Sequence, residues 1–340
     1  MDGKHKEPGP ASESWFGTAA RGLVPIGIAS CAALVIGGGV DLVHQHQASG
    51  KKERAAKPAA ERDETGPRYV VGVRDKGAAL VVRDVRTGHD VGLPVAAPAG
   101  QRFQRVAVAG ERSFVVATKA GAQVTFQKLK LSEDGEPQKL TGLPDATVSG
   151  VSTAWSDLAV EPESDRIAYV TYRRGGGSRV DVVAADGTGR KAWTSKAPAR
   201  IGNMSWAGST LSFVYTPVKK AAGRTVHQLR ALDTNAASGD LRASKAVMRL
   251  PKGASAAVLS RDGRSVLAGA VQNGQLTVQS YDAATGAPAK ALWKGRLAGT
   301  APRLDLDRTG EHVLAAGSDG RLRGPAGQSV PAEDLLDAAW

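Results

Sequence analysis

Short apolar runs alternate with tight polar turns along most of the chain after residue 68. The clearest example starts at Ala257 and reads Ala-Val-Leu-Ser-Arg-Asp-Gly-Arg-Ser-Val-Leu, which is two apolar segments around one polar turn. Asp-Gly between apolar segments is a strong β-hairpin signal, because glycine adopts positive φ without a steric penalty. The pattern therefore predicts a strand, a tight turn and a second strand.

This strand–turn–strand pattern recurs. The second strands are predicted to begin near Phe114, Ile167, Leu211, Val266 and Val313. Their spacing of roughly 45–55 residues is typical of propeller blades. A second hairpin follows several copies, often with an Asp-x-x-Thr-Gly turn in which the carboxylate caps the backbone and glycine supplies positive φ. Each unit therefore contains four strands.

Six units are counted when the hairpin near Tyr69 is included, and this first unit lacks its innermost strand. The last residues, Leu335–Trp340, resemble an innermost strand with nothing after it. We therefore expect them to pair with the strand at Tyr69–Val73 and close the ring, because an open ring exposes sheet edges. The predicted fold is all-β, a propeller of six four-stranded blades over residues 68–340.

Two turns carry a family resemblance. Trp206-Ala207-Gly208 and the turn Ser260–Gly263, within these repeated units, resemble the WD-repeat-like and TolB-like bacterial propellers that follow a membrane anchor. The full Trp-Ser-Pro-Asp-Gly turn of those propellers is not intact in any unit. The resemblance covers residues 68–340, and it implies a scaffold or binding role more often than catalysis.

The segment before the repeats contains an uncharged run, Leu23–Val40, whose 18 residues meet the lower limit for a membrane-spanning helix. We favour an uncleaved signal anchor. A cleaved signal peptide is an alternative, although the leading region is long and no clear Ala-x-Ala site follows. A lipoprotein signal is another, because Ile28–Cys31 resembles a lipobox with Cys31 as lipid acceptor.

The expected organisation is a cytoplasmic tail at 1–21, a transmembrane signal anchor at 22–43, a disordered stalk at 44–67 and the propeller at 68–340. Basic residues flank both ends of the span almost equally, so the positive-inside rule does not decide the orientation. We place the propeller outside the cytoplasm, because a short N-terminal tail with a single anchor usually exports the domain attached to it.

The amino-acid composition limits the partners, disulfides and metal sites that we expect. The chain carries a formal net charge of +12, which favours anionic partners. With only five Tyr and five Phe, it has few platforms on which the bases of single-stranded nucleic acid stack. Nucleic acid is not an expected partner of a domain that lies outside the cytoplasm. Cys31 is the single cysteine, which excludes an intrachain disulfide, and no Cys/His cluster has the spacing of a zinc site.

No known catalytic pattern is present. The sequence contains no Gly-x-Ser-x-Gly elbow, His-Glu-x-x-His motif, P-loop or dinucleotide-binding glycine pattern. We therefore predict no catalytic residues, no metal site and no cofactor, and we expect a binding module. A propeller hydrolase or lyase, and a transmembrane regulator that senses an envelope signal, are the alternatives.

The candidate binding residues are cations in the loops that join the second strand to the third, which share one face of a propeller. These loops carry Arg173, Arg174 and Arg179 in unit three, Lys219, Lys220 and Arg224 in unit four, and Lys119 and Arg74 in units two and one. Adjacent blades would build a basic patch, with Arg173, Arg174, Lys219, Lys220 and Arg224 at its centre. An acidic protein surface or an anionic envelope polymer is the expected partner.

Overall fold

The computed structural model describes residues 66–173, 176–218, 225–297, 299, 303–325, 327 and 329–340. The predicted tail and anchor, residues 1–21 and 22–43, and nearly all of the predicted stalk lie outside this range. Within it, no helix has the length and apolar character needed to cross a membrane.

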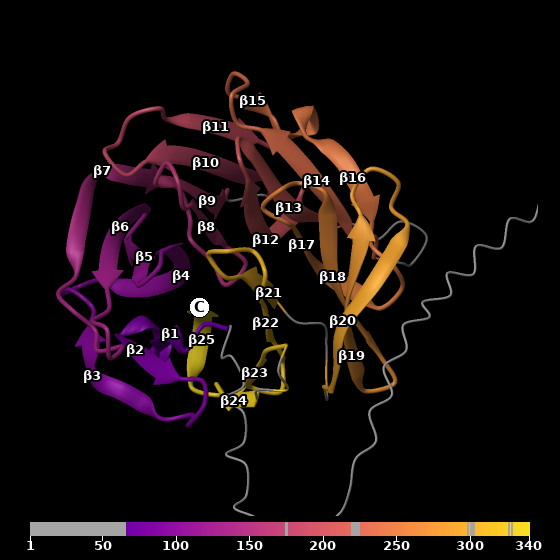
Figure 1. Ribbon diagram of the computed structural model, residues 1–340. Helices are drawn as coiled ribbons and strands as arrows, with labels where there is room; N and C mark the ends of the chain where they lie inside the picture. Colours follow the sequence, from indigo (N-terminus) through magenta and orange to yellow (C-terminus); the bar gives the residue numbers. More distant parts are fainter. Residues whose placement is uncertain are drawn as a thin grey trace, which may run out of the picture. The chain divides into compact units, whose positions relative to one another are not determined.

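The described chain forms six sheets, which confirms the predicted propeller of six blades (Figure 1). From the inside outward, blade 1 consists of β25 (Leu335–Ala339), β1 (Tyr69–Arg74), β2 (Ala79–Asp84) and β3 (Asp90–Ala96). Blade 2 consists of β4 (Arg102–Gly110), β5 (Ser113–Ala120), β6 (Gln123–Lys130) and β7 (Thr141–Ser149). Blade 3 consists of β8 (Leu158–Glu161), β9 (Arg166–Tyr172), β10 (Ser178–Ala184) and β11 (Lys191–Thr194).

Blades 4 to 6 follow the same order. Blade 4 consists of β12 (Ala199–Ala207), β13 (Thr210–Pro217), β14 (Gln228–Asp233) and β16 (Lys245–Arg249). Blade 5 consists of β17 (Ala254–Leu259), β18 (Ser265–Gln272), β19 (Gln275–Asp282) and β20 (Pro288–Arg296). Blade 6 consists of β21 (Arg303–Leu306), β22 (Val313–Ala316), β23 (Arg321–Arg323) and β24 (Ser329–Pro331). The short strand β15 (Gly239–Asp240) adds a fifth, parallel strand to blade 3. Two 3-10 turns, η1 (Asp75–Gly77) and η2 (Leu241–Ala243), complete the elements.

The core is divided among the spaces between blades. Six clusters of buried apolar side chains are found in the described residues, one between each pair of neighbouring blades. Inner strands are therefore covered on both faces, and β8, for example, is buried along its whole length. This is why the inner strands have continuous apolar sequences, as expected for strands between two layers.

The hairpin turns have the chemistry that their sequences predict. At the turn of blade 5, Asp262 accepts hydrogen bonds from the Ser260 hydroxyl (2.6 Å) and the Arg264 amide (3.0 Å), and Gly263 has φ 72°. In the Asp-x-x-Thr-Gly turn, Asp282 accepts from the amide of Thr285 at 2.7 Å. The carboxylates are therefore turn caps, as predicted.

The C-terminal strand closes the ring, which confirms a second prediction. β25 pairs antiparallel with β1, so that Val71 faces Ala339 and Val73 faces Asp337. Trp340 is only 3% exposed and packs with residues of blades 1 and 6, among them Val70 and Leu322. The end of the chain thus completes blade 1 and its contact with blade 6.

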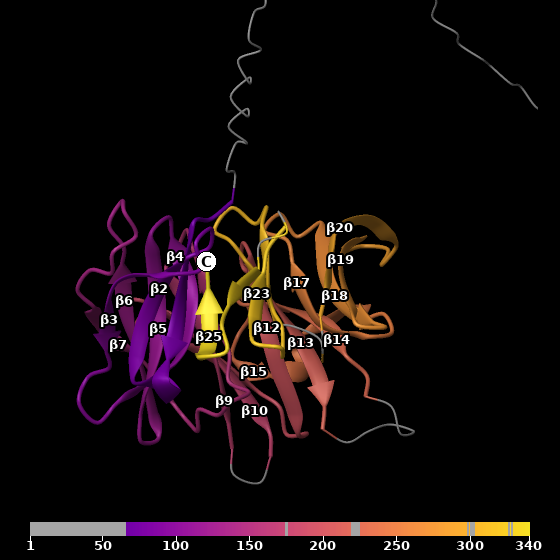
Figure 2. The same cartoon turned by 90° about the horizontal axis from the view of Figure 1, so that it is seen from below.

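The ring has two distinct faces (Figure 2). We call the stem face the one that carries residues 66–68 and the turns between first and second strands. The loop face is opposite, and it carries the turns between second and third strands, such as the turn at Gly121 and Ala122 between β5 and β6. β9 and β13 belong to neighbouring blades, and both strands end at the loop face.

Ring closure predicts a large stability effect. Deleting Leu335–Trp340 exposes the edge of β1, and Trp340→Ala alone should cost roughly 3–5 kcal/mol, as for other buried aromatic residues. Both changes should lower the melting temperature measured by circular dichroism, and the deletion should also promote aggregation. Leu336→Ala is the control: Leu336 lies on the same strand but is 53% exposed, so its loss should shift stability little. An unchanged melting temperature for Trp340→Ala would show that the Trp340 side chain does not stabilise the closed ring.

Candidate functional site

An apolar pocket opens between blades 3 and 4 on the loop face. We call it the aromatic pocket; it has a volume of about 350 Å³ and is lined by Val151, Thr153, Trp155, Tyr172, Arg173, Gly176, Gly177, Pro198, Ala199, Arg200 and Val218. This volume lies at the small end of ligand pockets, which are mostly apolar with a few polar groups.

The pocket gathers exposed apolar side chains. Val218 is 54% exposed, Trp155 is 53% exposed and Val151 is 37% exposed, and all three line the pocket. Six large apolar residues are exposed in the described chain, so half of them meet at this one site. Single exposed apolar residues need no explanation, but a cluster around a hollow marks an interaction site.

The Trp155 ring is held by its neighbours. The Arg200 guanidinium lies over the ring at 4.3 Å from its centre, and the Tyr172 ring meets it edge-on at 6.4 Å. The Tyr172 hydroxyl donates to the Trp155 carbonyl (3.1 Å) and accepts from the Ile201 amide (3.2 Å). Burial raises the pKa of Tyr172, so this hydroxyl stays protonated and adds no negative charge to the pocket.

The segment before β8 positions these groups. It turns back at residues 153–156, where the Ser156 amide donates to the Thr153 carbonyl (3.0 Å). Arg105 of blade 2 donates to the carbonyls of Ala154 and Ser156. A cation from the neighbouring blade therefore fixes the backbone on both sides of Trp155.

The predicted basic residues meet this site only in part. Arg173 is exposed and lines the pocket. Arg174, Lys219, Lys220 and Arg224 lie outside the described residues; Lys219 directly follows Val218 in the sequence. The three supporting residues were expected in loops but lie in strands, and Lys119 is the penultimate residue of β5. Arg179 lies within β10 and binds Asp181 at 2.6 Å, and Arg74 binds Asp90 at 2.7 Å. These two charges are already neutralised.

A second cavity, of about 420 Å³, lies on the axis of the ring at the loop face. Each blade contributes to its lining: Asp337, Arg105, Asp157, Asn203, Ser255 and Arg303 come from blades 1 to 6 in that order. Trp155 and Arg200 line both this central cavity and the aromatic pocket, so the two spaces adjoin.

The carboxylates of the central cavity are occupied by structural bonds. Arg303 binds Asp157 at 2.8 Å and also binds Asp337. The second oxygen of Asp157 accepts from the Met204 amide (3.0 Å), and that of Asp337 accepts from the Val106 amide (2.8 Å). These acids join the innermost strands of different blades.

The histidine at this cavity is likewise bound. His227 Nδ1 is 2.8 Å from the Thr216 hydroxyl, and burial lowers its pKa, which favours the neutral ring at pH 7. Among the described residues, no group of three or more His, Cys, Asp or Glu is placed to hold a metal ion. The central cavity therefore offers a polar surface with its acids already engaged.

Sequence reasoning missed Trp155, Tyr172 and Arg200. Trp155 lies in the polar segment Ser152–Asp157, outside any predicted strand. A tryptophan among small polar residues between strands is the one local signal of an exposed ring. Its partners come from β9 and β12, and this juxtaposition has no local signal.

No known protein family matches the sequence, and no curated protein matches it either. Solved structures are similar in fold. A protein of unknown function from Bacteroides caccae is 8% identical with a TM-score of 0.49, over 81% of this chain and 98% of that chain. TolB from Acinetobacter baumannii is 14% identical with a TM-score of 0.48, over 80% of this chain and 66% of that chain. The Dos1 propeller is 14% identical with a TM-score of 0.40, over 75% and 64%.

Asp305 of β21 should make the stability of the folded protein depend on pH. Its desolvation raises its pKa to about 6, even though Arg303 and Arg261 act in the opposite direction. Since the folded pKa exceeds the unfolded value of 3.8, Asp305 favours the folded state at low pH. That contribution is lost as the pH rises from about 4 to about 6. Asp305→Asn stays neutral, so its unfolding free energy relative to wild type should rise by about 3 kcal/mol across this window.

Urea denaturation between pH 4 and pH 7 measures this difference. Asp186→Asn is the control. Hydrogen bonds from Thr188 lower the pKa of Asp186, so removing this carboxylate should not raise the unfolding free energy relative to wild type as the pH rises. A pH-independent difference between Asp305→Asn and wild type would show that Asp305 ionises normally.

Proposed function

We propose that this protein is a single-pass membrane protein whose extracytoplasmic propeller binds a partner protein through the aromatic pocket. The observation that carries the proposal is the meeting of three exposed apolar side chains with two arginines, Arg173 and Arg200, on one face. Aromatic residues and arginine are the groups that most often dominate protein–protein binding energy.

The chemistry of the pocket favours an acidic protein segment with an apolar anchor. Val151, Pro198 and Val218 offer walls for an apolar side chain, and Arg173 and Arg200 offer partners for carboxylates. The predicted cations Arg174, Lys219, Lys220 and Arg224 would extend the positive rim, and the net charge of +12 would speed association with an acidic partner. A purely anionic polymer would use the cations but leave the apolar walls without a function.

The position of the pocket suits an anchored receptor. Residues 66–68 enter the propeller on the stem face, and the aromatic pocket lies on the opposite face (Figure 2). The point of attachment therefore does not cover the pocket, and a large partner can approach it. An anchor at Leu23–Val40, as proposed, would therefore be joined to the propeller at the face away from the pocket.

Charge reversal tests the basic rim. Changing Arg173, Arg174, Lys219 and Lys220 together to glutamate alters the charge by about eight units without touching a buried strand, so stability should stay nearly unchanged. Capture of acidic envelope proteins from a membrane extract should fall sharply, and wild-type capture should weaken as salt rises, because screening acts beyond roughly 8 Å at physiological salt.

Trp155→Ala tests the pocket itself. Loss of a central aromatic contact should weaken binding of the captured partner by about 2 kcal/mol or more, as for an interface hot spot. Leu93→Ala is the matched control, because Leu93 is 84% exposed but lies on β3, away from the pocket.

For the charge reversal, the control is the same change at Lys245, Arg249, Lys290 and Lys294, which lie on the outer strands β16 and β20. If the loop-face variants bind as the controls do, the loop face is not the binding surface. If the loop-face variants lose binding only to a phosphate-rich polymer, the partner is not a protein.

The anchor makes a prediction of its own. A reporter that is active only after export should be active when fused after Trp340, and a reporter that is active only in the cytoplasm should be silent there. Cys31→Ser should leave the protein in the membrane fraction. Release of the protein by Cys31→Ser would instead establish lipid attachment, and activity of the cytoplasmic reporter would reverse the orientation.

A further inference from the structure

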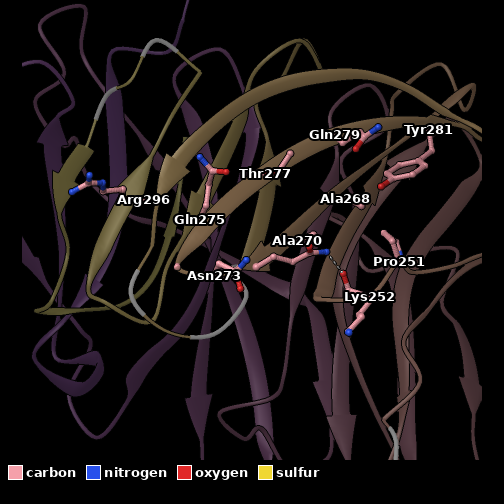
Figure 3. Close-up of a pocket in the computed structure, with 12 residues that line it drawn as sticks. Pro251, Lys252, Ala268, Ala270, Asn273, Gln275, Thr277, Gln279, Tyr281 and Arg296 are labelled. Carbon is pink, nitrogen blue, oxygen red and sulfur yellow. Dashed lines mark hydrogen bonds between the residues drawn. The ribbon is translucent and has the colours of Figure 1, made fainter.

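A polar groove runs along blade 5 on the side that faces blade 4, separate from the aromatic pocket. Its volume is about 640 Å³. Figure 3 shows Gln275, Thr277, Gln279 and Tyr281 following one strand, β19, along this groove. Alternate residues of a strand point to the same side, so these four side chains form one row. At roughly 3.3 Å per residue, the row spans about 20 Å.

Small residues on the neighbouring strand create the groove. In the pairing of β18 with β19, Ala270 lies opposite Thr277 and Ala268 lies opposite Gln279. Methyl groups at these two positions leave the longer polar side chains of β19 standing above an open floor. The groove is therefore a consequence of alanine at two paired positions.

Blade 2 provides an internal comparison. The sequence Gln-x-Thr-x-Gln occurs at Gln275–Gln279 and again at Gln123–Gln127. In blade 2 the residues opposite are Thr118 and Val116, and Gln127 is buried. The last glutamine of the motif is thus buried in blade 2, as Gln127, and only half-buried in blade 5, where Gln279 lines the groove.

The polar groups of the groove are available to a ligand. Gln272 donates from Nε2 to the Lys252 carbonyl at 3.0 Å. In the part of the chain that the structure describes, the side chains of Gln275, Thr277 and Gln279 have no hydrogen-bond partner. A side-chain amide both donates and accepts, and a hydroxyl does the same. A row of such groups matches a ligand that presents hydroxyl groups at regular intervals.

Two cations add a charge preference. Arg296 pairs with Gln275 across β20 and β19, and Lys252 lies across the groove, next to Gln272. Neither side chain has an ion-pair partner among the described residues. Tyr281, at the far end of the row, presents an aromatic ring of the kind that packs against apolar or ring-shaped groups.

We propose that this groove binds an acidic oligosaccharide chain, with Gln275, Thr277 and Gln279 hydrogen-bonded to sugar hydroxyls and with Arg296 and Lys252 paired with carboxylates. The length of the row, its repeated amide and hydroxyl groups and its cationic end all fit such a chain. A polyphosphate would use the two cations but not the row of amides. This second site is independent of the partner proposed for the aromatic pocket.

Binding of a short glucuronate oligosaccharide to the full-length chain, measured by calorimetry, tests the proposal. The double variant Gln275→Ala/Thr277→Val should weaken binding by about tenfold, as expected from the loss of two hydrogen-bonding groups. The matched control is Gln123→Ala/Thr125→Val, the same change on the equivalent strand of blade 2, and its affinity should equal that of wild type. The thermal melt of each variant reports whether it folds.

Arg296→Gln separates charge from hydroxyl recognition, and its exposed position makes misfolding no concern. It should weaken binding of the glucuronate oligosaccharide and leave binding of a glucose oligosaccharide of the same length unchanged. The proposal is overturned if wild type does not bind the glucuronate chain, if the groove variant binds as its control does, or if inorganic polyphosphate binds as tightly and loses affinity only with Arg296→Gln.

Discussion

One arginine links the blades at the loop face. Arg303 of blade 6 binds Asp337 of blade 1 and Asp157 of blade 3, across the axis of the ring. The two acids in turn accept backbone amides from blades 2 and 4. Five of the six blades are therefore joined through one guanidinium. Removing one member of a buried pair leaves an uncompensated charge, which typically costs roughly 3–5 kcal/mol, so the geometry of the whole loop face depends on this contact.

The same contact determines which functions the loop face can support. Because Asp157 and Asp337 are fully engaged by Arg303 and by amides, their carboxylates serve the structure. Asp157 also lies two residues after Trp155, so fixing Asp157 helps to fix the aromatic pocket. A rigid apolar surface with cations at its rim is suited to binding, since preorganised side chains lose little entropy when a partner docks. The fixed carboxylates and the preorganised rim are the features on which the proposed partner binding at this face depends.

The sequence predicted those features that depend on local chemistry. Asp262 and Gly263 specify a hairpin through their own backbone preferences, and the apolar runs specify strands covered on both faces. Closure by Leu335–Trp340 followed from counting strands. The aromatic pocket was not predictable in this way, because Trp155 meets Tyr172 only when β9 pairs within blade 3, and it meets Arg200 only after blades 3 and 4 pack together. Arg179 was expected in a loop because strand ends are poorly defined by sequence, and its pairing with Asp181 within β10 shows how one shifted boundary changes a charge from free to neutralised.

Blades 2 and 5 show where functional differences arise in a repeated fold. Both contain the sequence Gln-x-Thr-x-Gln on the third strand, and both present it toward the preceding blade. Val116 and Thr118 on the paired strand of blade 2 fill the space before it, whereas Ala268 and Ala270 in blade 5 leave it open. The polar strand is thus a shared element, and the size of the residues opposite decides whether its last glutamine is buried, as Gln127 is, or half-buried and lining a groove, as Gln279 is. The loss of four methyl-sized groups from the paired strand is enough to open a groove between blades, because close-packed interiors do not relax to fill such losses.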